Sequence, residues 1–133
     1  MSVDPATQQL LRRAYDAFNA RDIEAALVLM HPDVDWPNAL AGTRVHGRAE
    51  VRDYWARQFE VIDSRVEPLA FSARANGSIA VQVHQTVRDR TGALLSDGTV
   101  EHVYSIRDDQ VERMDISDDG SRHAPGQPGR MTE

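Results

Sequence analysis

Cysteine is absent from this chain of 133 residues. Without thiols the protein can form no disulfide, no thiolate nucleophile and no zinc–thiolate site. Long apolar stretches are missing too, and none approaches the roughly 20 residues that a membrane helix needs. The first ten residues also lack the apolar segment of a signal peptide. Together these absences predict a soluble, cytoplasmic protein.

Basic residues are too few to balance the acids: 15 Lys and Arg stand against 21 Asp and Glu, for a formal net charge of -6. The basic residues are interleaved with acids, which argues against binding to nucleic acid or to an anionic membrane. The histidines form no i, i+4 pair and no tight motif with a carboxylate, so no metal site is predicted. The sequence also lacks a Gly-rich phosphate loop and a nucleophile elbow. We therefore predict no cofactor.

The N-terminal half of the sequence has the period of amphipathic helices. Asp4-Pro5 predicts the start of a first helix, which continues through Phe18. Asp22 predicts the cap of a second, short helix that includes Met30 and stops at His31-Pro32. A short strand over 34–36, a loop over 38–47 and a third helix over about 49–62 are predicted to follow.

The second half of the sequence has a period of two, which is typical of strands. The turn signals Asn76-Gly77, Thr91-Gly92 and Asp108-Asp109 separate the predicted strands. Those strands span 66–75, 79–87, 94–107 and 111–117. From residue 118 onward Asp, Gly, Ser, Pro and Arg dominate, which predicts a flexible tail over 118–133 after a single domain over 1–117.

This order of elements predicts an α+β domain, with three N-terminal helices packed on a curved, mainly antiparallel sheet. Antiparallel strands need one covered face, and three amphipathic helices can cover it. Strong twist would curl the sheet and leave a cavity between the sheet and the helices.

Several segments resemble one known family in their order and spacing. They are residues 15–22 running into 25–27, then 31–36, then 47–51 leading to 54–55, and finally 101–106 with 111–114. Together they are similar to the nuclear transport factor 2-like superfamily, and within it to the SnoaL-like and ketosteroid-isomerase-like proteins, over about residues 7 to 117. The resemblance implies a cone-shaped, cystatin-like roll with a deep apolar pocket and frequent dimers. It implies no single chemistry, because this fold has many functions.

His102 is the first candidate for catalysis. The resemblance places at this position the acidic hydrogen-bond donor with which the isomerases stabilise an enolate-like oxyanion. A histidine there can donate a hydrogen bond or carry a proton near neutral pH. The alternative is a histidine half buried in a sheet and bonded to a neighbour.

Asp115 is the second candidate. A two-residue turn at Asp108-Asp109 pairs Ile106 with Val111, and the same register places His102 opposite Asp115, either as a catalytic pair or as a cross-strand pair on the surface. A bulge in this hairpin would break that pairing. In addition, Met114 and Ile116 are apolar and predicted to face the core, which would turn Asp115 to the opposite side.

Trp36 occupies the position at which the resemblance places the catalytic aspartate of the isomerases. The proton-abstracting base is therefore missing here, and Trp36 is predicted to be a pocket wall or a core aromatic. Asn38 either offers its amide to a ligand or shapes its loop. The other predicted pocket residues are Tyr15, Tyr54, Trp55, Met114 and Ile116.

Two functions remain open from the sequence. The first is a small-molecule-binding protein that acts as a cofactor-independent isomerase or cyclase on a small hydrophobic carbonyl compound. The alternative is a non-catalytic module that binds a small apolar ligand or dimerises, and in either case we expect a homodimer through the sheet. Epoxide hydrolysis, which some relatives of this fold perform, would need an Asp–Arg–Asp set in the pocket. Asp35, Arg113 and Asp115 have the right types, but strand alternation predicts no common face for all three.

Overall fold

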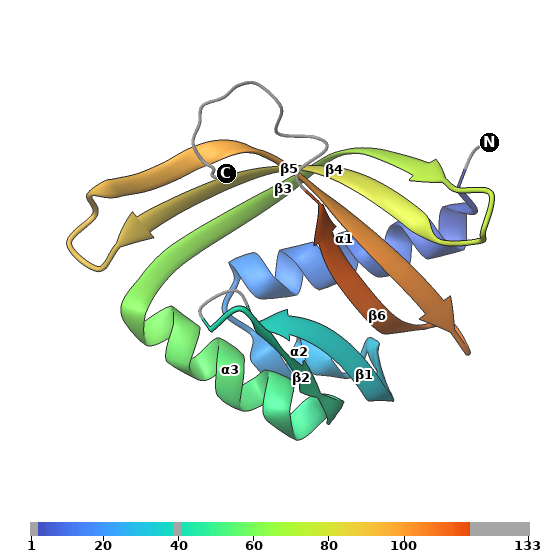
Figure 1. Ribbon diagram of the computed structural model, residues 1–133, viewed down its shortest axis with the longest axis horizontal. Helices are drawn as coiled ribbons and strands as arrows, with labels where there is room; N and C mark the ends of the chain where they lie inside the picture. Colours follow the sequence, from blue (N-terminus) through green and yellow to red (C-terminus); the bar gives the residue numbers. More distant parts are fainter. Residues whose placement is uncertain (1–2, 39–40, 118–133) are drawn as a thin grey trace.

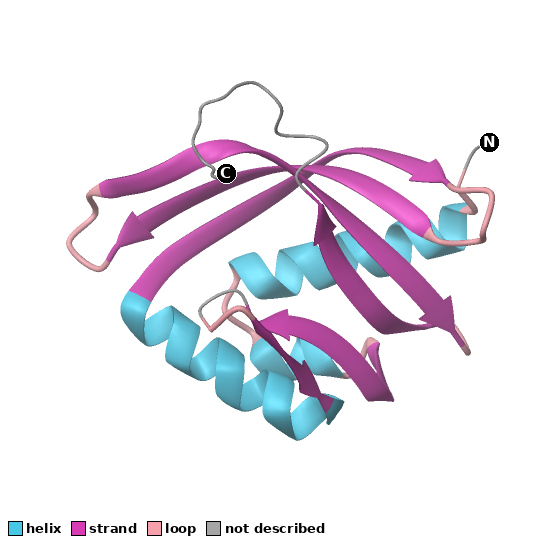
Figure 2. Ribbon diagram, viewed as in Figure 1, coloured by secondary structure: helices cyan, strands magenta, loops and turns pink. Residues whose placement is uncertain are grey.

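The computed structural model describes residues 3–38 and 41–117. Three helices, α1 (Pro5–Asn19), α2 (Ile23–Leu27) and α3 (Gly47–Val61), lie on one side of a sheet (Figures 1 and 2). The six strands are β1 (Met30–Asn38), β2 (Thr43–His46), β3 (Ile62–Ala73), β4 (Ile79–Asp89), β5 (Leu94–Arg107) and β6 (Gln110–Ser117). The predicted α+β class is therefore confirmed, with three helices on a curved sheet.

The strands form one mixed sheet in the order β2-β1-β6-β5-β4-β3. Only β1 and β6 pair in parallel, and the other neighbours are antiparallel. The register shifts in three antiparallel pairs, at Pro68/Ala70, Val87/Arg88 and Ser105/Ile106. Such irregularities bend strands and increase their twist, so they help the long strands β3, β4 and β5 to curl over the helices (Figure 1).

The caps of the first two helices are the residues that the sequence predicts. The side chain of Asp4 accepts a hydrogen bond from the backbone N–H of Ala6, at 3.3 Å. The side chain of Asp22 accepts from the N–H of Ala25, at 3.1 Å. Each carboxylate satisfies a backbone donor that the first helical turn leaves without a partner.

The second helix is shorter than predicted. It ends at Leu27, and Met30 begins β1 by pairing with Val111 of β6. Met30 is almost fully buried. Its apolar side chain thus belongs to the buried face of the sheet and not, as predicted, to the apolar face of the helix. Pro32 lies where the register of β1 against β6 shifts, a position at which a strand tolerates proline.

The loop predicted over 38–47 contains a strand. β2 pairs antiparallel with the end of β1, from Asp35↔His46 to Asn38↔Thr43. Its four residues include one buried side chain, Val45, which is too little for an alternating pattern to stand out. The third helix and β3 also meet without a loop, because β3 already starts at Ile62.

Asn19, the last residue of α1, fastens this helix to the edge strand β3. Its side-chain Nδ2 donates to the carbonyl of Val66 (2.7 Å), and its Oδ1 accepts from the N–H of Val66 (3.0 Å). The amide thus pairs with β3 in the way a neighbouring strand would.

None of the helices among residues 3–38 and 41–117 is long and apolar enough to cross a membrane. The predicted tail over 118–133 lies outside the described residues.

Candidate functional site

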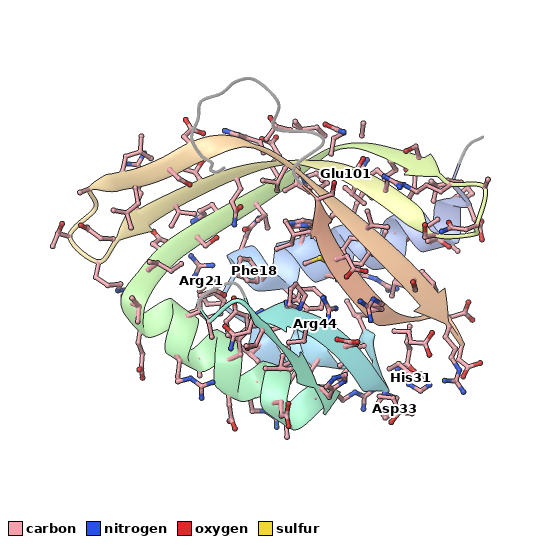
Figure 3. All side chains as sticks on the ribbon, viewed as in Figure 1. Phe18, Arg21, His31, Asp33, Arg44 and Glu101 are labelled. Carbon is pink, nitrogen blue, oxygen red and sulfur yellow. The ribbon has the colours of Figure 1, made fainter. Side chains whose placement is uncertain are left out.

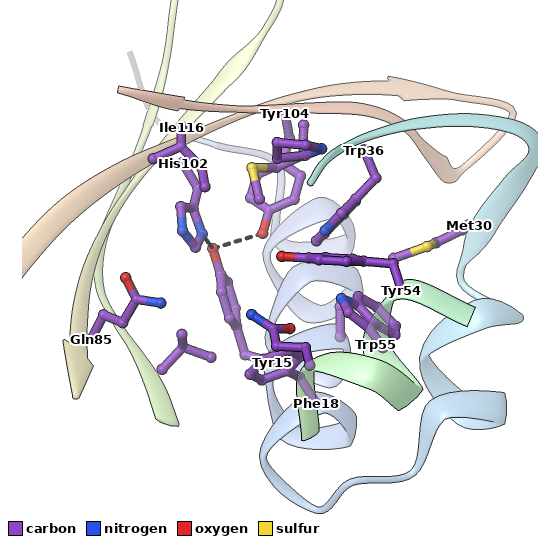
Figure 4. Close-up of a pocket in the computed structure, with 15 residues that line it drawn as sticks. Tyr15, Phe18, Met30, Trp36, Tyr54, Trp55, Gln85, His102, Tyr104 and Ile116 are labelled. Atoms are coloured by element: carbon purple, nitrogen blue, oxygen red, sulfur yellow. Dashed lines mark hydrogen bonds between the residues drawn. The ribbon is translucent and has the colours of Figure 1, made fainter. Parts of the chain in front are cut away.

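A cavity of about 80 Å³ lies between the helices and the inner face of the sheet. Six aromatic side chains line this cavity: Tyr15, Phe18, Trp36, Tyr54, Trp55 and Tyr104 (Figure 4). His102, Gln58 and Gln85 are the polar side chains among the other lining residues. No Asp, Glu or Arg lines the cavity within the described part of the chain. The site is therefore apolar with a few uncharged polar groups, as small-molecule sites usually are.

His102 reaches the cavity because strand alternation directs it inward. The residue before it, Glu101, lies on the opposite face of the sheet (Figure 3), where Arg74 donates to its carboxylate at 2.6 Å. His102 itself is only 6% exposed. Tyr104, two residues further along β5, shares the inner face and is 2% exposed.

Three side chains form a hydrogen-bonded relay, which we call the Tyr104–Tyr15–His102 relay. The hydroxyl of Tyr104 donates to the hydroxyl of Tyr15 at 2.8 Å. The hydroxyl of Tyr15 lies 2.9 Å from Nδ1 of His102 (Figure 4). Because Tyr15 already accepts from Tyr104, its own proton is available for Nδ1. A neutral imidazole that accepts at Nδ1 carries its proton on Nε2.

Burial keeps all three members of the relay uncharged. It lowers the pKa of His102 to about 4, since a charged imidazolium would lose its water shell. Burial likewise raises the pKa of Tyr15 well above its ordinary value, and the neighbouring Tyr104 adds to that rise. The pKa of Tyr104 is raised by burial as well. At neutral pH the site thus presents a neutral imidazole and two phenols.

Nε2 of His102 makes no hydrogen bond to any residue within 3–38 or 41–117. The imidazole can therefore donate from Nε2 to a molecule in the cavity. The hydrogen bond from Tyr15 draws electron density from Nδ1 and strengthens the donor at Nε2, because linked hydrogen bonds polarise one another.

Most residues that the sequence singled out for the pocket lie in its wall. Tyr15, Trp36, Tyr54, Trp55, Met114 and Ile116 line the cavity together with His102. Asn38 does not line it. The Oδ1 of Asn38 accepts from the backbone N–H of Ala41 at 3.0 Å, so this side chain shapes the turn before β2.

The predicted pairing of His102 with Asp115 is wrong. Ile106 does pair with Val111, but the register shifts at Ser105/Ile106, so that His102 lies opposite Ile116. Asp115 pairs with Val103 instead and faces away from the cavity. The bulge thus exchanges the acid for an apolar neighbour, and it is Tyr15, from a helix, that holds the imidazole.

Asp115 belongs to an ion-pair cluster with Asp35, Arg44 and Arg113 outside the cavity wall. Arg44 from β2 (labelled in Figure 3) donates to Asp35 at 2.5 Å and to Asp115 at 3.1 Å. Arg113 donates to Asp35 at 2.7 Å and to Asp115 at 2.9 Å. The hydrogen bond from Arg113 lowers the pKa of Asp115. Contrary to the prediction from alternation, the two aspartates and Arg113 do meet, because parallel pairing places Asp35 of β1 beside Arg113 of β6.

Three polar groups of the site were not predicted from the sequence: Tyr104, Gln58 and Gln85. Tyr104 had a usable signal, since it follows His102 at the strand period of two. Gln58 follows Tyr54 and Trp55 at helical spacing, but a glutamine on an apolar helix face is hard to distinguish from a surface residue by pattern alone. Gln85 lies on the β4 face that alternation assigns to Val83 and Val87.

Comparisons with known proteins agree with this geometry. The family model of the SnoaL-like domain matches residues 11–114. Among solved structures, TerC crystallised with polyporic acid superposes with a TM-score of 0.73 at 25% identity, over 84% of this chain and 89% of that one. An NTF2-like protein of unknown function from Burkholderia pseudomallei gives 0.73 at 24% identity, over 87% and 90%. A candidate ketosteroid isomerase from Kribbella flavida gives 0.69 at 23% identity, over 96% and 88%. No curated protein matches the sequence.

Proposed function

This chain belongs to the SnoaL-like domain family, and from that premise we propose that its cavity binds a small apolar carbonyl compound and polarises the carbonyl oxygen. The family match supports an isomerase-like, cyclase-like or ligand-binding role. TerC, a similar structure, was crystallised with polyporic acid. The observation that carries the finer proposal is the Tyr104–Tyr15–His102 relay, which leaves Nε2 of His102 as a donor in an apolar cavity.

A neutral imidazole suits this role. When a base removes a proton beside a carbonyl, negative charge develops on the oxygen, and a pre-placed donor in a dry site stabilises that charge. Burial lowers the pKa of His102 to about 4, so the imidazole is neutral at pH 7 and donates its Nε2–H to this oxygen. The aromatic wall lowers the polarity around the ligand, which strengthens the hydrogen bond.

The size of the cavity limits the ligand. A volume of about 80 Å³ is well below the roughly 300–1,000 Å³ of pockets for drug-sized molecules. We therefore propose a compound of about one small ring as the ligand of this conformation.

Non-catalytic binding is the second candidate function, and one observation favours it. No carboxylate lines the cavity in the described residues, and Trp36 stands where the resemblance places the base of the isomerases. A carbonyl bound there would be polarised but would meet no side chain placed to take its α-proton.

Cyclopentanone tests both candidates, because it has one carbonyl, enolisable α-protons and a single ring. Binding is measured by calorimetry, and exchange of the α-protons is followed by NMR in D₂O. We expect His102→Leu to weaken binding about tenfold, the effect of one lost hydrogen bond in a buried site. Exchange faster than in buffer supports the isomerase-like function, and binding without exchange supports the second candidate. Equal binding by the wild type and His102→Leu rejects the proposed role of the relay.

A homodimer through the sheet also remains a proposal. Leu69 of β3 and the pair Leu94 and Leu95 of β5 are 53–56% exposed, which is consistent with an apolar contact surface. Light scattering after size exclusion measures the mass directly. A monomer at micromolar concentration would reject this proposal.

A further inference from the structure

Gln58 carries a buried carbonyl without a partner. The residue is 8% exposed, and its Oε1 makes no hydrogen bond within the described residues. A buried acceptor without a partner is costly, and native proteins keep few of them.

The position of Gln58 explains why its amide meets the cavity. Gln58 follows Tyr54 by four residues and Trp55 by three on α3, so the three side chains share one face of the helix. All three line the cavity. The neighbouring wall is aromatic and offers no hydrogen-bond donor that the structure pairs with this oxygen.

We infer that Gln58 selects the ligand, and that the ligand carries a hydroxyl donor in addition to its apolar ring. Such a hydroxyl satisfies Oε1 when the ligand enters and gives binding a hydrogen bond that the empty protein lacks. This inference rests on the proposed function, since it concerns the same cavity. It adds a second recognition group: His102 donates to a carbonyl oxygen, and Gln58 accepts from a hydroxyl.

Gln85 provides a matched control. It is the other glutamine in the wall, but its Nε2 donates to the hydroxyl of Ser64 at 3.3 Å. An effect of cavity shape or polarity in general would appear in both glutamine variants. An effect of the unpaired carbonyl appears only at position 58.

Phenol and toluene are the probes, because they have nearly the same shape and differ in the hydroxyl. Affinities are measured by calorimetry for the wild type, Gln58→Met and Gln85→Met. We expect Gln58→Met to weaken phenol about tenfold and to leave toluene within twofold, while Gln85→Met changes the ratio of the two affinities by less than twofold. Equal losses for both probes, or no loss of phenol binding, would overturn the inference.

A second measurement covers the case in which Gln58→Met fails to fold. In the wild type, phenol should shift the side-chain amide resonances of Gln58 by more than toluene does, because toluene contributes the ring-current shift but no hydrogen bond. Identical shifts with both probes would also overturn the inference. Cyclopentanone separates this result from the proposed function: its binding should persist in Gln58→Met, because it offers no hydroxyl and depends on His102. Cyclopentanone binding by His102→Leu therefore tests the proposed function. The binding of phenol and toluene by Gln58→Met tests this inference separately.

Discussion

The hydroxyl of Tyr15 on α1 lies 2.9 Å from Nδ1 of His102 on β5, across 87 residues of sequence. This contact joins the helical layer to the sheet in the middle of the cavity wall. It also fixes which nitrogen of the imidazole is free for a ligand. The tautomer of His102 is thus set by a residue from another layer of the fold.

Tyr15→Phe is expected to change that tautomer. Without the hydroxyl, Nδ1 of His102 and the hydroxyl of Tyr104 both lose their partner, which should cost about 1–3 kcal/mol of unfolding free energy. Nitrogen-15 NMR of the imidazole distinguishes the tautomers. Tyr104→Phe is the comparison, because it removes the first member of the relay and leaves Tyr15 bonded to Nδ1. A wild-type spectrum in Tyr15→Phe would show that the hydroxyl does not determine the tautomer.

Stability should fall below pH 6.5 because of His102. Its pKa is about 4 in the folded protein and about 6.5 when unfolded, so the unfolded chain takes up more protons between these values. The stability contribution is complete above pH 6.5 and is lost as the pH falls toward 4. From these two pKa values we expect a loss on the order of 2 kcal/mol between pH 7 and pH 5.

Urea unfolding at pH 7 and pH 5 measures this loss, and His102→Leu provides the reference. Carboxylates elsewhere titrate in both proteins, so only the difference between them reports on His102. The titratable side chains that face the imidazole are Tyr15 and Tyr104, and both stay protonated over this range. Equal pH dependence in the two proteins would contradict a buried, neutral histidine.

The sequence was sufficient for the main features of this fold because local signals carried them. Asp4 and Asp22 are strong helix caps, and the turn signals at Asn76-Gly77 and Thr91-Gly92 separate strands where the structure separates them. Met30 and β2 were misassigned for a different reason. Their conformation depends on partners distant in sequence, Val111 for Met30 and the end of β1 for β2.

The site was predicted less well than the fold because one bulge decides its chemistry. A regular hairpin would have put Asp115 opposite His102, and alternation could not detect the extra residue in β6, Glu112, which has no partner between Ser105↔Arg113 and Ile106↔Val111. Tyr15 could be assigned to an apolar helix face, but its contact with an imidazole 87 residues away depends on how α1 crosses the sheet. Aromatic wall residues such as Trp55 were easier, because helical period alone directs them inward.

Asp115→Asn is expected to leave ligand binding within twofold of the wild type. Asp115 is absent from the cavity wall and lies in the ion-pair cluster with Arg44 and Arg113. Because its side chain is 44% exposed, the loss of unfolding free energy should stay below about 1 kcal/mol. Calorimetry with cyclopentanone checks the first expectation and urea unfolding the second. A tenfold loss of binding would show that Asp115 does contribute to the function of the site.

Asn19→Ala is expected to destabilise the protein by about 2 kcal/mol. It removes both hydrogen bonds to the backbone of Val66 and so detaches the end of α1 from β3. Asn76→Ala is a suitable control, because Asn76 accepts hydrogen bonds only from Ser78, within an exposed turn. Thermal unfolding compares the two variants. If both variants lost the same unfolding free energy, the hydrogen bonds of Asn19 to β3 would stabilise the protein no more than those of an exposed turn.

Trp36→Ala should widen the range of ligands. The indole of Trp36 stands in the cavity wall and packs edge-on against Trp55, with ring centroids 5.4 Å apart. Because Trp36 is only partly buried, its removal should cost about 3 kcal/mol, at the lower end for truncation of a large aromatic. The space gained should admit 1-indanone, which is cyclopentanone fused to a second ring and too large for a cavity of about 80 Å³.

Phe59→Ala is the matched control, since Phe59 packs on Phe18 but does not line the cavity. We expect 1-indanone to bind Trp36→Ala at least tenfold more tightly than it binds the wild type or Phe59→Ala. Equal affinity in all three proteins would mean that the size of the ligand is set elsewhere in the wall.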